Sequence, residues 1–123
     1  MVSPKPAPAK TILCIDDEMT SLWVRSLVLQ MAGYRVLSAT TAEEGLAMFR
    51  AESVALVITD NLLAGTTGGA AAREMKSLKP HIAIIMLSGA PEKPEGAEIA
   101  DLFLTKGECD PEELLCHVAN LVK

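Results

Sequence analysis

The stretch Ala55-Leu56-Val57-Ile58-Thr59-Asp60 predicts the centre of the fold. Five uncharged residues run directly into a carboxylate, and such a run is typical of a parallel strand that is buried on both faces. Asn61 and the glycine-threonine cluster at 65–69 then end the strand and turn the chain. Asp60 either caps this loop or lies at the carboxyl end of a central strand, where open α/β sheets hold their ligands.

Further strand-like and helix-like segments alternate on both sides of this stretch. We expect strands at 11–15, 34–39, 82–87 and 102–105, and helices at 22–32, 41–50, 69–78 and from 110 to the C-terminus. This alternation predicts an α/β fold: a doubly wound, five-stranded parallel sheet with helices on both faces. The segment 89–96 contains two prolines and leaves little room for a helix, so we expect a reduced or irregular fourth helix there.

The ends, the charge and the cysteines limit the class of protein. Residues 1–10 (MVSPKPAPAK) predict a flexible Pro-rich tail, followed by one domain at 11–123. The net charge of −5 with no basic stripe argues against nucleic acid and anionic membranes as direct partners. No apolar run is long enough to span a membrane, and three cysteines without paired spacing favour a reducing, cytoplasmic location.

Four of the expected strands run into residues that carry a charge or a hydroxyl group. These residues are Asp16-Asp17, Asp60, Ser88 and Lys106. Because parallel strands share one carboxyl edge, the side chains should converge there, although each alone would more often be a loop, turn or surface residue. Clustered carboxylates require positive charge, which Lys106 and a hard cation such as Mg²⁺ can supply. A carboxylate beside a metal ion and a lysine is suited to phosphoryl transfer.

With these residues in place, the chain resembles the receiver domain of two-component response regulators (the CheY-like superfamily) over about residues 11–122. The resemblance rests on Asp16-Asp17, on Asp60 with Gly68 eight residues later, on Ser88 and on Lys106. It implies a flavodoxin-like sheet of order 2-1-3-4-5. It also implies that Asp60 accepts a phosphoryl group from a histidine kinase or a histidine phosphotransfer protein, and that an unknown downstream protein reads the signal.

The resemblance also implies roles for individual residues around Asp60. The implied Mg²⁺ ligands are Asp16, Asp17, Asp60 and the backbone carbonyl of Leu62. Ser88 and Lys106 would hold the phosphoryl oxygens. Phe103 falls at the place of the family's aromatic switch residue, although a plain core role fits it equally well. Leu62 and Ala90 fall where family members orient the hydrolytic water, and neither side chain can hydrogen-bond.

The chain departs from the family pattern at several loops. Leu63-Ala64 stands where the family has Met-Pro, so we expect a more mobile loop. Gly107 stands where the family has a cis-proline after the lysine. A cis bond before a residue other than proline costs about 2.5–4 kcal/mol, so we expect a trans Lys106–Gly107 bond.

The first helix carries more apolar residues than one buried face requires. At helical spacing, Val24, Val28 and Ala32 share an expected inward arc. Trp23, Leu27 and Met31 form a second stripe beside it. Either the helix is rolled to bury this stripe, or the stripe is a partner surface, for example of a homodimer.

Two classes of function remain open at this point. The first is a phosphoacceptor with at most slow autophosphatase activity, rather than an enzyme with turnover. The second is a receiver-like interaction module that no longer depends on phosphorylation. A small α/β enzyme or flavin binder is a more distant alternative, since no phosphate-cradling glycine-rich loop is present. Both a stand-alone protein and a fragment of a hybrid kinase fit the sequence.

Overall fold

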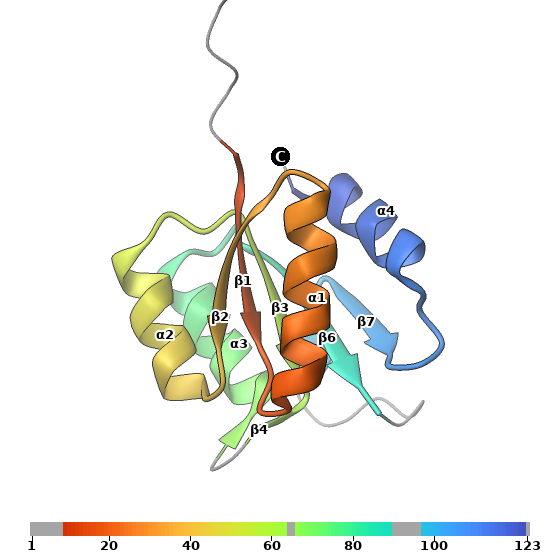
Figure 1. Ribbon diagram of the computed structural model, residues 1–123. Coiled ribbons are helices and arrows are strands. Elements are labelled where there is room, and N and C mark those ends of the chain that lie inside the picture. Colours follow the sequence, from red (N-terminus) through yellow and green to blue (C-terminus); the bar gives the residue numbers. More distant parts are fainter. Residues whose placement is uncertain (1–8, 64–65, 90–96, 123) are drawn as a thin grey trace, which may run out of the picture.

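The computed structural model describes residues 9–63, 66–89 and 97–122, and their main feature is one parallel sheet (Figure 1). Its five strands lie in the order β2-β1-β3-β6-β7. Their bounds are Thr11–Ile15 for β1, Arg35–Ala39 for β2, Leu56–Asp60 for β3, Ala83–Ser88 for β6 and Leu102–Thr105 for β7. Counted along this sheet alone, the order is 2-1-3-4-5, which confirms the predicted doubly wound, flavodoxin-like topology.

Helices cover both faces of the sheet (Figure 1). They are α1 (Met19–Met31), α2 (Ala42–Ala51), α3 (Gly68–Leu78) and α4 (Pro111–Leu121). Alternate residues of β1 point to opposite faces, so that Ile12 packs in the core under α1 and α4, and Leu13 in the core under α2 and α3. Every residue of β1 and β3 is buried, which explains why both read as nearly continuous apolar runs.

The expected helix starts at Thr41 and Asp110 are confirmed. The Thr41 side chain accepts a hydrogen bond from the backbone N–H of Glu44, and Asp110 accepts one from the N–H of Glu113. These side chains satisfy amide groups that the first turn of a helix leaves without a partner. None of the described helices has the length and apolar character needed to cross a membrane.

The connections around the site agree with expectation except at the ribbon after Asp60. The described part of the link between β6 and β7 holds one short 3₁₀ helix, η1 (Ala97–Ile99), while residues 90–96, with Ala90, lie outside the described residues. After Asp60, a small antiparallel ribbon pairs β4 (Leu62–Leu63) with β5 (Thr66–Thr67), where the sequence predicted only a loop. The described residues contain no cis peptide bond, so the predicted trans Lys106–Gly107 bond is confirmed.

The orientation predicted for the first helix is wrong. The buried residues of α1 are Leu22, Arg25 and Leu29, whereas Val24 and Ala32 are exposed and Val28 is only half-buried. The apolar pattern missed this face because it contains an arginine, whose charge is neutralised by Asp16. The alternative that the helix rolls to bury Trp23, Leu27 and Met31 is also wrong, since all three are exposed.

Gly68 is required by the close approach of α3 to the end of β3. Its N–H donates to the carbonyl oxygen of Asn61 at 2.8 Å, and a Cβ atom there would collide with the carbonyl oxygen of Asp60. We expect Gly68→Ala to lower the free energy of unfolding by about 1–3 kcal/mol, because backbone atoms must shift to admit the methyl group. Denaturant unfolding measures this loss.

Gly89→Ala is the matched control. A Cβ at Gly89 meets no atom of the described residues within 4 Å. The change should therefore be neutral or stabilise the chain by less than about 1 kcal/mol, through the entropy of the unfolded state. Equal losses for the two variants would contradict the steric argument.

Candidate functional site

The site lies at the carboxyl edge of the sheet, where β1, β3, β6 and β7 end side by side. Asp60 and Ser88 are the last residues of β3 and β6, and Asp16 and Lys106 directly follow β1 and β7. Parallel pairing sets Asp60 beside Leu87 and Ser88 beside Thr105, which brings the four ends to one level. The residues expected to converge therefore do so.

Three carboxylates gather at this edge. One carboxylate oxygen from each of Asp16, Asp17 and Asp60 lies within 4.8 Å of the other two. Asp16 and Asp60 are buried, while Asp17 is exposed and leaves the cluster open to solvent on its side. The cluster can thus be reached by an ion or a substrate from outside.

Lys106 places a positive charge between two of these carboxylates. Its Nζ atom lies 2.9 Å from Oδ2 of Asp16 and 3.1 Å from Oδ2 of Asp60. The backbone N–H of Lys106 donates to the carbonyl oxygen of Ser88 at 2.6 Å, which ties the end of β7 to that of β6. One lysine thus connects residues that lie 90 and 46 positions away in the sequence.

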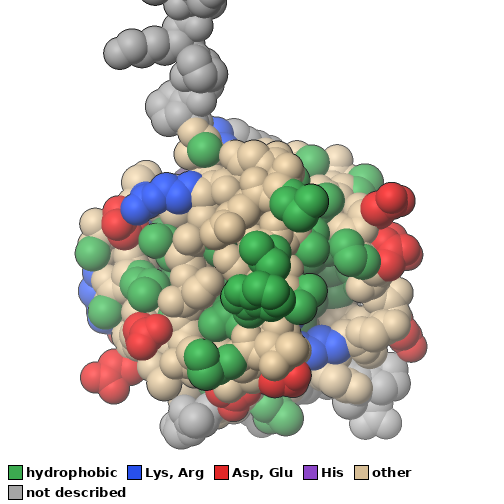
Figure 2. All heavy atoms as spheres, in the orientation of Figure 1, with side chains coloured by type: hydrophobic (Ala, Val, Ile, Leu, Met, Phe, Trp, Pro, Cys, Tyr) green, Lys and Arg blue, Asp and Glu red, His purple; other side chains and the backbone are tan. Residues whose placement is uncertain are grey.

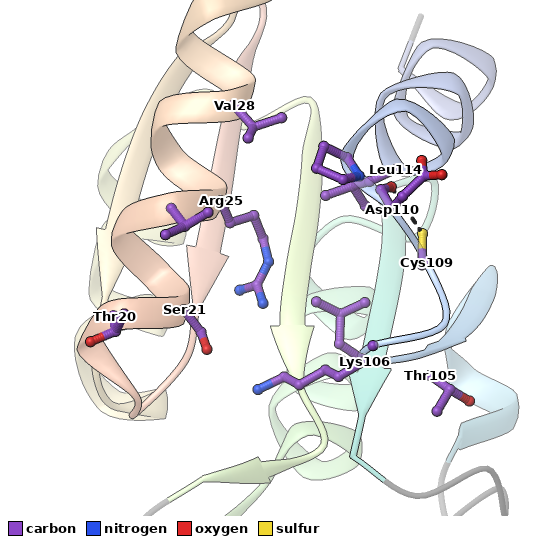
Figure 3. Close-up of a pocket in the computed structure, with 13 residues that line it drawn as sticks. Thr20, Ser21, Arg25, Val28, Thr105, Lys106, Cys109, Asp110 and Leu114 are labelled. Carbon is purple, nitrogen blue, oxygen red and sulfur yellow. Dashed lines mark hydrogen bonds between the residues drawn. The ribbon is translucent and has the colours of Figure 1, made fainter.

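Arg25 is a second cation of the site, and sequence reasoning missed it. It extends from α1 toward the space that Lys106 also faces (Figure 3), and its Nη1 atom lies 3.3 Å from Oδ2 of Asp16. Both side chains of this pair are buried. The available signal was an arginine spaced three and four residues from Leu22 and Leu29, on the same face of the helix.

The surroundings separate the acidities of the two buried carboxyl groups. Burial raises the pKa of Asp60, and the nearby charge of Asp16 adds to the effect, which Lys106 offsets only in part. Burial also tends to raise the pKa of Asp16, but other contacts outweigh this effect and hold that pKa below its ordinary value. These contacts are hydrogen bonds from the Glu18 N–H and from Lys106, together with the positive charges of Lys106 and Arg25. Burial tends to lower the pKa of Lys106, but its hydrogen bonds to both aspartates outweigh this effect and raise that pKa.

The remaining residues singled out from the sequence lie around or away from this cluster. Ser88 is buried at the end of β6, and Leu62 points its side chain outward, with 70% of its surface exposed. Phe103 is half-buried in β7 and packs against the core under α2 and α3. Trp23, Leu27 and Met31 are on the outer face of α1 and do not join the site.

The charges of the cluster fit a divalent cation. Three carboxylates (Asp16, Asp17 and Asp60) face two cations (Arg25 and Lys106), which leaves one negative charge among the five groups. Carboxylate oxygens are the ligands that Mg²⁺ prefers, and the open side at Asp17 allows it to keep water ligands. The donor set is therefore suited to Mg²⁺ rather than to a thiolate-binding metal.

Comparisons with known proteins agree with this geometry. The family model described as the response regulator receiver domain matches residues 12–119. The chain is 34% identical over 120 residues to the phosphate regulon transcriptional regulatory protein PhoB of Pseudomonas aeruginosa, covering 93% of this chain and 52% of PhoB. It is 30% identical over 115 residues to the transcriptional regulatory protein YbdJ of Bacillus subtilis, covering 91% and 50%. The chain spans about half the length of these curated relatives.

Solved structures with the same fold include a complex with a metal. The response regulator TrrA of Thermotoga maritima, in complex with Mg²⁺ and BeF, superposes with a TM-score of 0.86 at 30% identity, covering 92% of this chain and 99% of TrrA. A response regulator receiver domain protein of Clostridium thermocellum gives a TM-score of 0.83 at 32% identity, covering 91% and 93%.

Removing Arg25 tests its part in holding Asp16. We expect Arg25→Met to lower the free energy of unfolding at neutral pH by about 1–3 kcal/mol, less than for an isolated buried pair because Lys106 still binds Asp16. The lowered pKa of Asp16 means that its ionised form stabilises the fold above the ordinary value of 3.8. The loss should therefore shrink as the pH falls below that value, as measured by denaturant unfolding across pH.

Arg50→Met is the control for this prediction. Arg50 pairs with Glu74 at the surface, where both side chains are about half exposed. Exposed pairs contribute about 0–1 kcal/mol, so the control should change little at any pH. An equal loss for both variants, or a loss from Arg25→Met that persists unchanged in acid, would contradict the assignment.

Proposed function

The chain belongs to the response regulator receiver domain family of two-component systems, and from this premise we propose that it is a phosphoacceptor with Asp60 as the residue that receives the phosphoryl group. The donor is a phosphohistidine of a histidine kinase or of a histidine phosphotransfer protein. The observation that carries the proposal is the position of Lys106, bonded at once to Asp16 and to Asp60 in a cluster with one uncompensated negative charge.

The chemistry is a displacement at phosphorus. An oxygen of Asp60 forms a bond to the phosphorus atom while the bond from phosphorus to the histidine nitrogen breaks, and that nitrogen keeps the electron pair. Burial of Asp60 at the strand end holds the carboxylate in one orientation, and Asp17 leaves the approach open on its side. The product is an acyl phosphate on Asp60.

Positively charged groups and a hydroxyl group around Asp60 would stabilise the charge on the transferred phosphoryl group. Lys106 lies 3.1 Å from the Asp60 oxygen, so its ammonium can donate to a phosphoryl oxygen attached there. Ser88, at the end of the neighbouring strand, is our second candidate for holding that group. When bound by Asp16, Asp17, Asp60 and the carbonyl of Leu62, Mg²⁺ would neutralise the remaining charge.

Arg25 acts on this site through Asp16. It binds the same oxygen, Oδ2, that accepts from Lys106, and it approaches from the opposite element, α1. Asp16 is therefore held from two sides, and it stays ionised because of its lowered pKa. In our proposal this makes Arg25 a positioning residue rather than a residue that touches the phosphoryl group.

The setting of the proposed function is a signalling relay in the cytoplasm. Two of the matched relatives are transcriptional regulators by name, and this chain matches only about half of each. Contact with nucleic acid therefore belongs to those full-length proteins, and our expectation that this chain itself does not bind nucleic acid stays a prediction. The output would instead pass through a protein partner.

Acetyl phosphate tests the acceptor directly. With Mg²⁺ present, the chain should gain one phosphoryl group by intact mass, and without Mg²⁺ the gain should be strongly reduced. Asp60→Asn should gain none, because an amide oxygen is a far weaker nucleophile than a carboxylate. Glu43→Gln, which changes an exposed carboxylate on α2, should behave like the unmodified chain.

The same assay decides between the two classes of function. If the unmodified chain takes no phosphoryl group from acetyl phosphate or from a phosphorylated histidine kinase domain, it is an interaction module that works without phosphorylation. Equal labelling of Asp60→Asn would instead show that another residue is the acceptor.

Leu62 sets the lifetime of the acyl phosphate in our proposal. Its exposed side chain lies two residues beyond Asp60 and cannot orient a water molecule for attack on the phosphorus atom. We expect Leu62→Asn to lose phosphate about three- to tenfold faster, because the amide can align the water. A time course by intact mass measures the rate.

Leu62→Ala is the control that separates orientation of the water from access to the site. It removes bulk without adding a hydrogen-bonding group, so its rate should stay within about twofold of the parent rate. If Leu62→Ala accelerates the loss as much as Leu62→Asn, the side chain acts only by shielding the site.

A further inference from the structure

The outer face of α1 exposes five large apolar side chains, with exposed fractions between 38% and 88%. They are Met19, Trp23, Val24, Leu27 and Met31. Figure 2 shows hydrophobic side chains gathered in the middle of this face, over α1, with the acidic and basic ones toward its margins. A cluster of this kind on a surface helix commonly marks a contact with another molecule.

Four of these residues form one straight row, which we call the α1 ridge. Met19, Trp23, Leu27 and Met31 follow one another at intervals of four residues, from the first residue of the helix to the last. Side chains spaced by four form the ridges that interlock when two helices pack at about 50°. The α1 ridge therefore has the geometry of a helix-packing surface along the whole length of α1.

The α1 ridge is also free of charge. Arg25 is the only charged residue of α1, and it points inward to Asp16, so none of the side chains on the outer face is charged. The chain as a whole carries a net charge of −5. When two copies meet through the outer face of α1, its side chains therefore bring no like charges together.

A hollow beside the α1 ridge adds room for a large side chain. It lies between α1 and α4 and has a volume of about 330 Å³ (Figure 3). Apolar side chains form much of its wall, and three charged residues, Arg25, Lys106 and Asp110, also line it. The apolar side chains include Val24, Val28, Pro111 and Leu114. Val24 belongs both to this hollow and to the exposed cluster, so the two surfaces are continuous.

We propose that the outer face of α1 is the interface of a homodimer, in which the α1 ridges of two copies cross and the indole of Trp23 fills the hollow of the other copy. A two-fold arrangement of this kind needs a surface that is complementary to itself, and a neutral ridge beside a hollow with largely apolar walls meets that need. The pairing goes beyond the proposed phosphoryl transfer and does not depend on it, because it is tested on the unphosphorylated chain. Arg25 and Lys106 of the site line the hollow, so the two surfaces adjoin.

The extent of the exposed face fits a weak dimer rather than a tight one. A standard interface buries about 800 Å² on each partner, and five exposed side chains on one helix supply only part of such an area. We therefore expect a dissociation constant in the micromolar range, about 1–100 µM. A partner of another kind that relied on ion pairs would find no charged side chain on this face.

Sedimentation over a range of concentrations tests the proposal on the unphosphorylated chain. The mass should rise from one chain to two with concentration, and the emission of Trp23, the only tryptophan, should shift to the blue in parallel. Trp23→Glu should raise the dissociation constant at least about 30-fold, because a charge would be buried and the central aromatic side chain lost. Its thermal unfolding should be nearly unchanged, since Trp23 is 65% exposed in one copy.

Leu78→Glu is the matched control. Leu78 is also an exposed large hydrophobic residue, at 47%, but it lies at the end of α3, which covers the opposite face of the sheet. This variant should dimerise like the unmodified chain. Met31→Glu, at the far end of the α1 ridge, gives a second test if Trp23→Glu does not fold.

Three results would overturn the proposal. The first is a monomer at all concentrations up to about 1 mM, a tenfold margin above the expected range. The second is a dimer that persists unchanged in the folded Trp23→Glu or Met31→Glu variant. The third is an equal loss of association in Leu78→Glu, which would show a general effect of added charge.

Discussion

One ammonium group shared by two carboxylates holds the functional edge of this molecule together. Lys106 joins the end of β7 to Asp16 after β1 and to Asp60 on β3, and its backbone N–H binds the end of β6. Without that charge, two buried carboxylates would repel each other, and the pKa of Asp60, already raised by burial, would rise further. One residue thus ties four strand ends together, and its side chain favours the ionised form of the proposed acceptor.

Arg25 makes the arrangement asymmetric. It contacts Asp16 but not Asp60. Two cations and a backbone hydrogen bond therefore lower the pKa of Asp16, whereas burial raises the pKa of Asp60 and Lys106 offsets this rise only in part. The ionised form of Asp16 is thereby the better stabilised of the two, and that of Asp60 the less stabilised. A nucleophile that is held in place but incompletely neutralised is suited to attack an electron-poor phosphorus atom.

The sheet and most of the cluster could be predicted because they follow from local rules. Buried parallel strands read as apolar runs, and parallel pairing forces their carboxyl ends to one edge, so Asp16, Asp60 and Lys106 had to meet. Arg25 could not be predicted in this way, because its burial depends on a partner nine residues away whose position only the fold determines. The ribbon of β4 and β5 was missed for a related reason, since two-residue strands leave no periodic pattern to read.

The same ion pair explains why α1 presents apolar residues to solvent. With Arg25 directed to Asp16, the helix is turned roughly a quarter of a revolution from the predicted orientation, which had Val24, Val28 and Ala32 inward. Leu22 and Leu29 are carried into the core beside Arg25, and Val24 and Trp23 are carried outward. An exposed apolar face has a cost in solubility, which a partner surface would offset. The inner and outer faces of α1 are therefore two consequences of one electrostatic requirement: a charge needed at the site is buried, and the apolar residues it displaces become available for contact with another molecule.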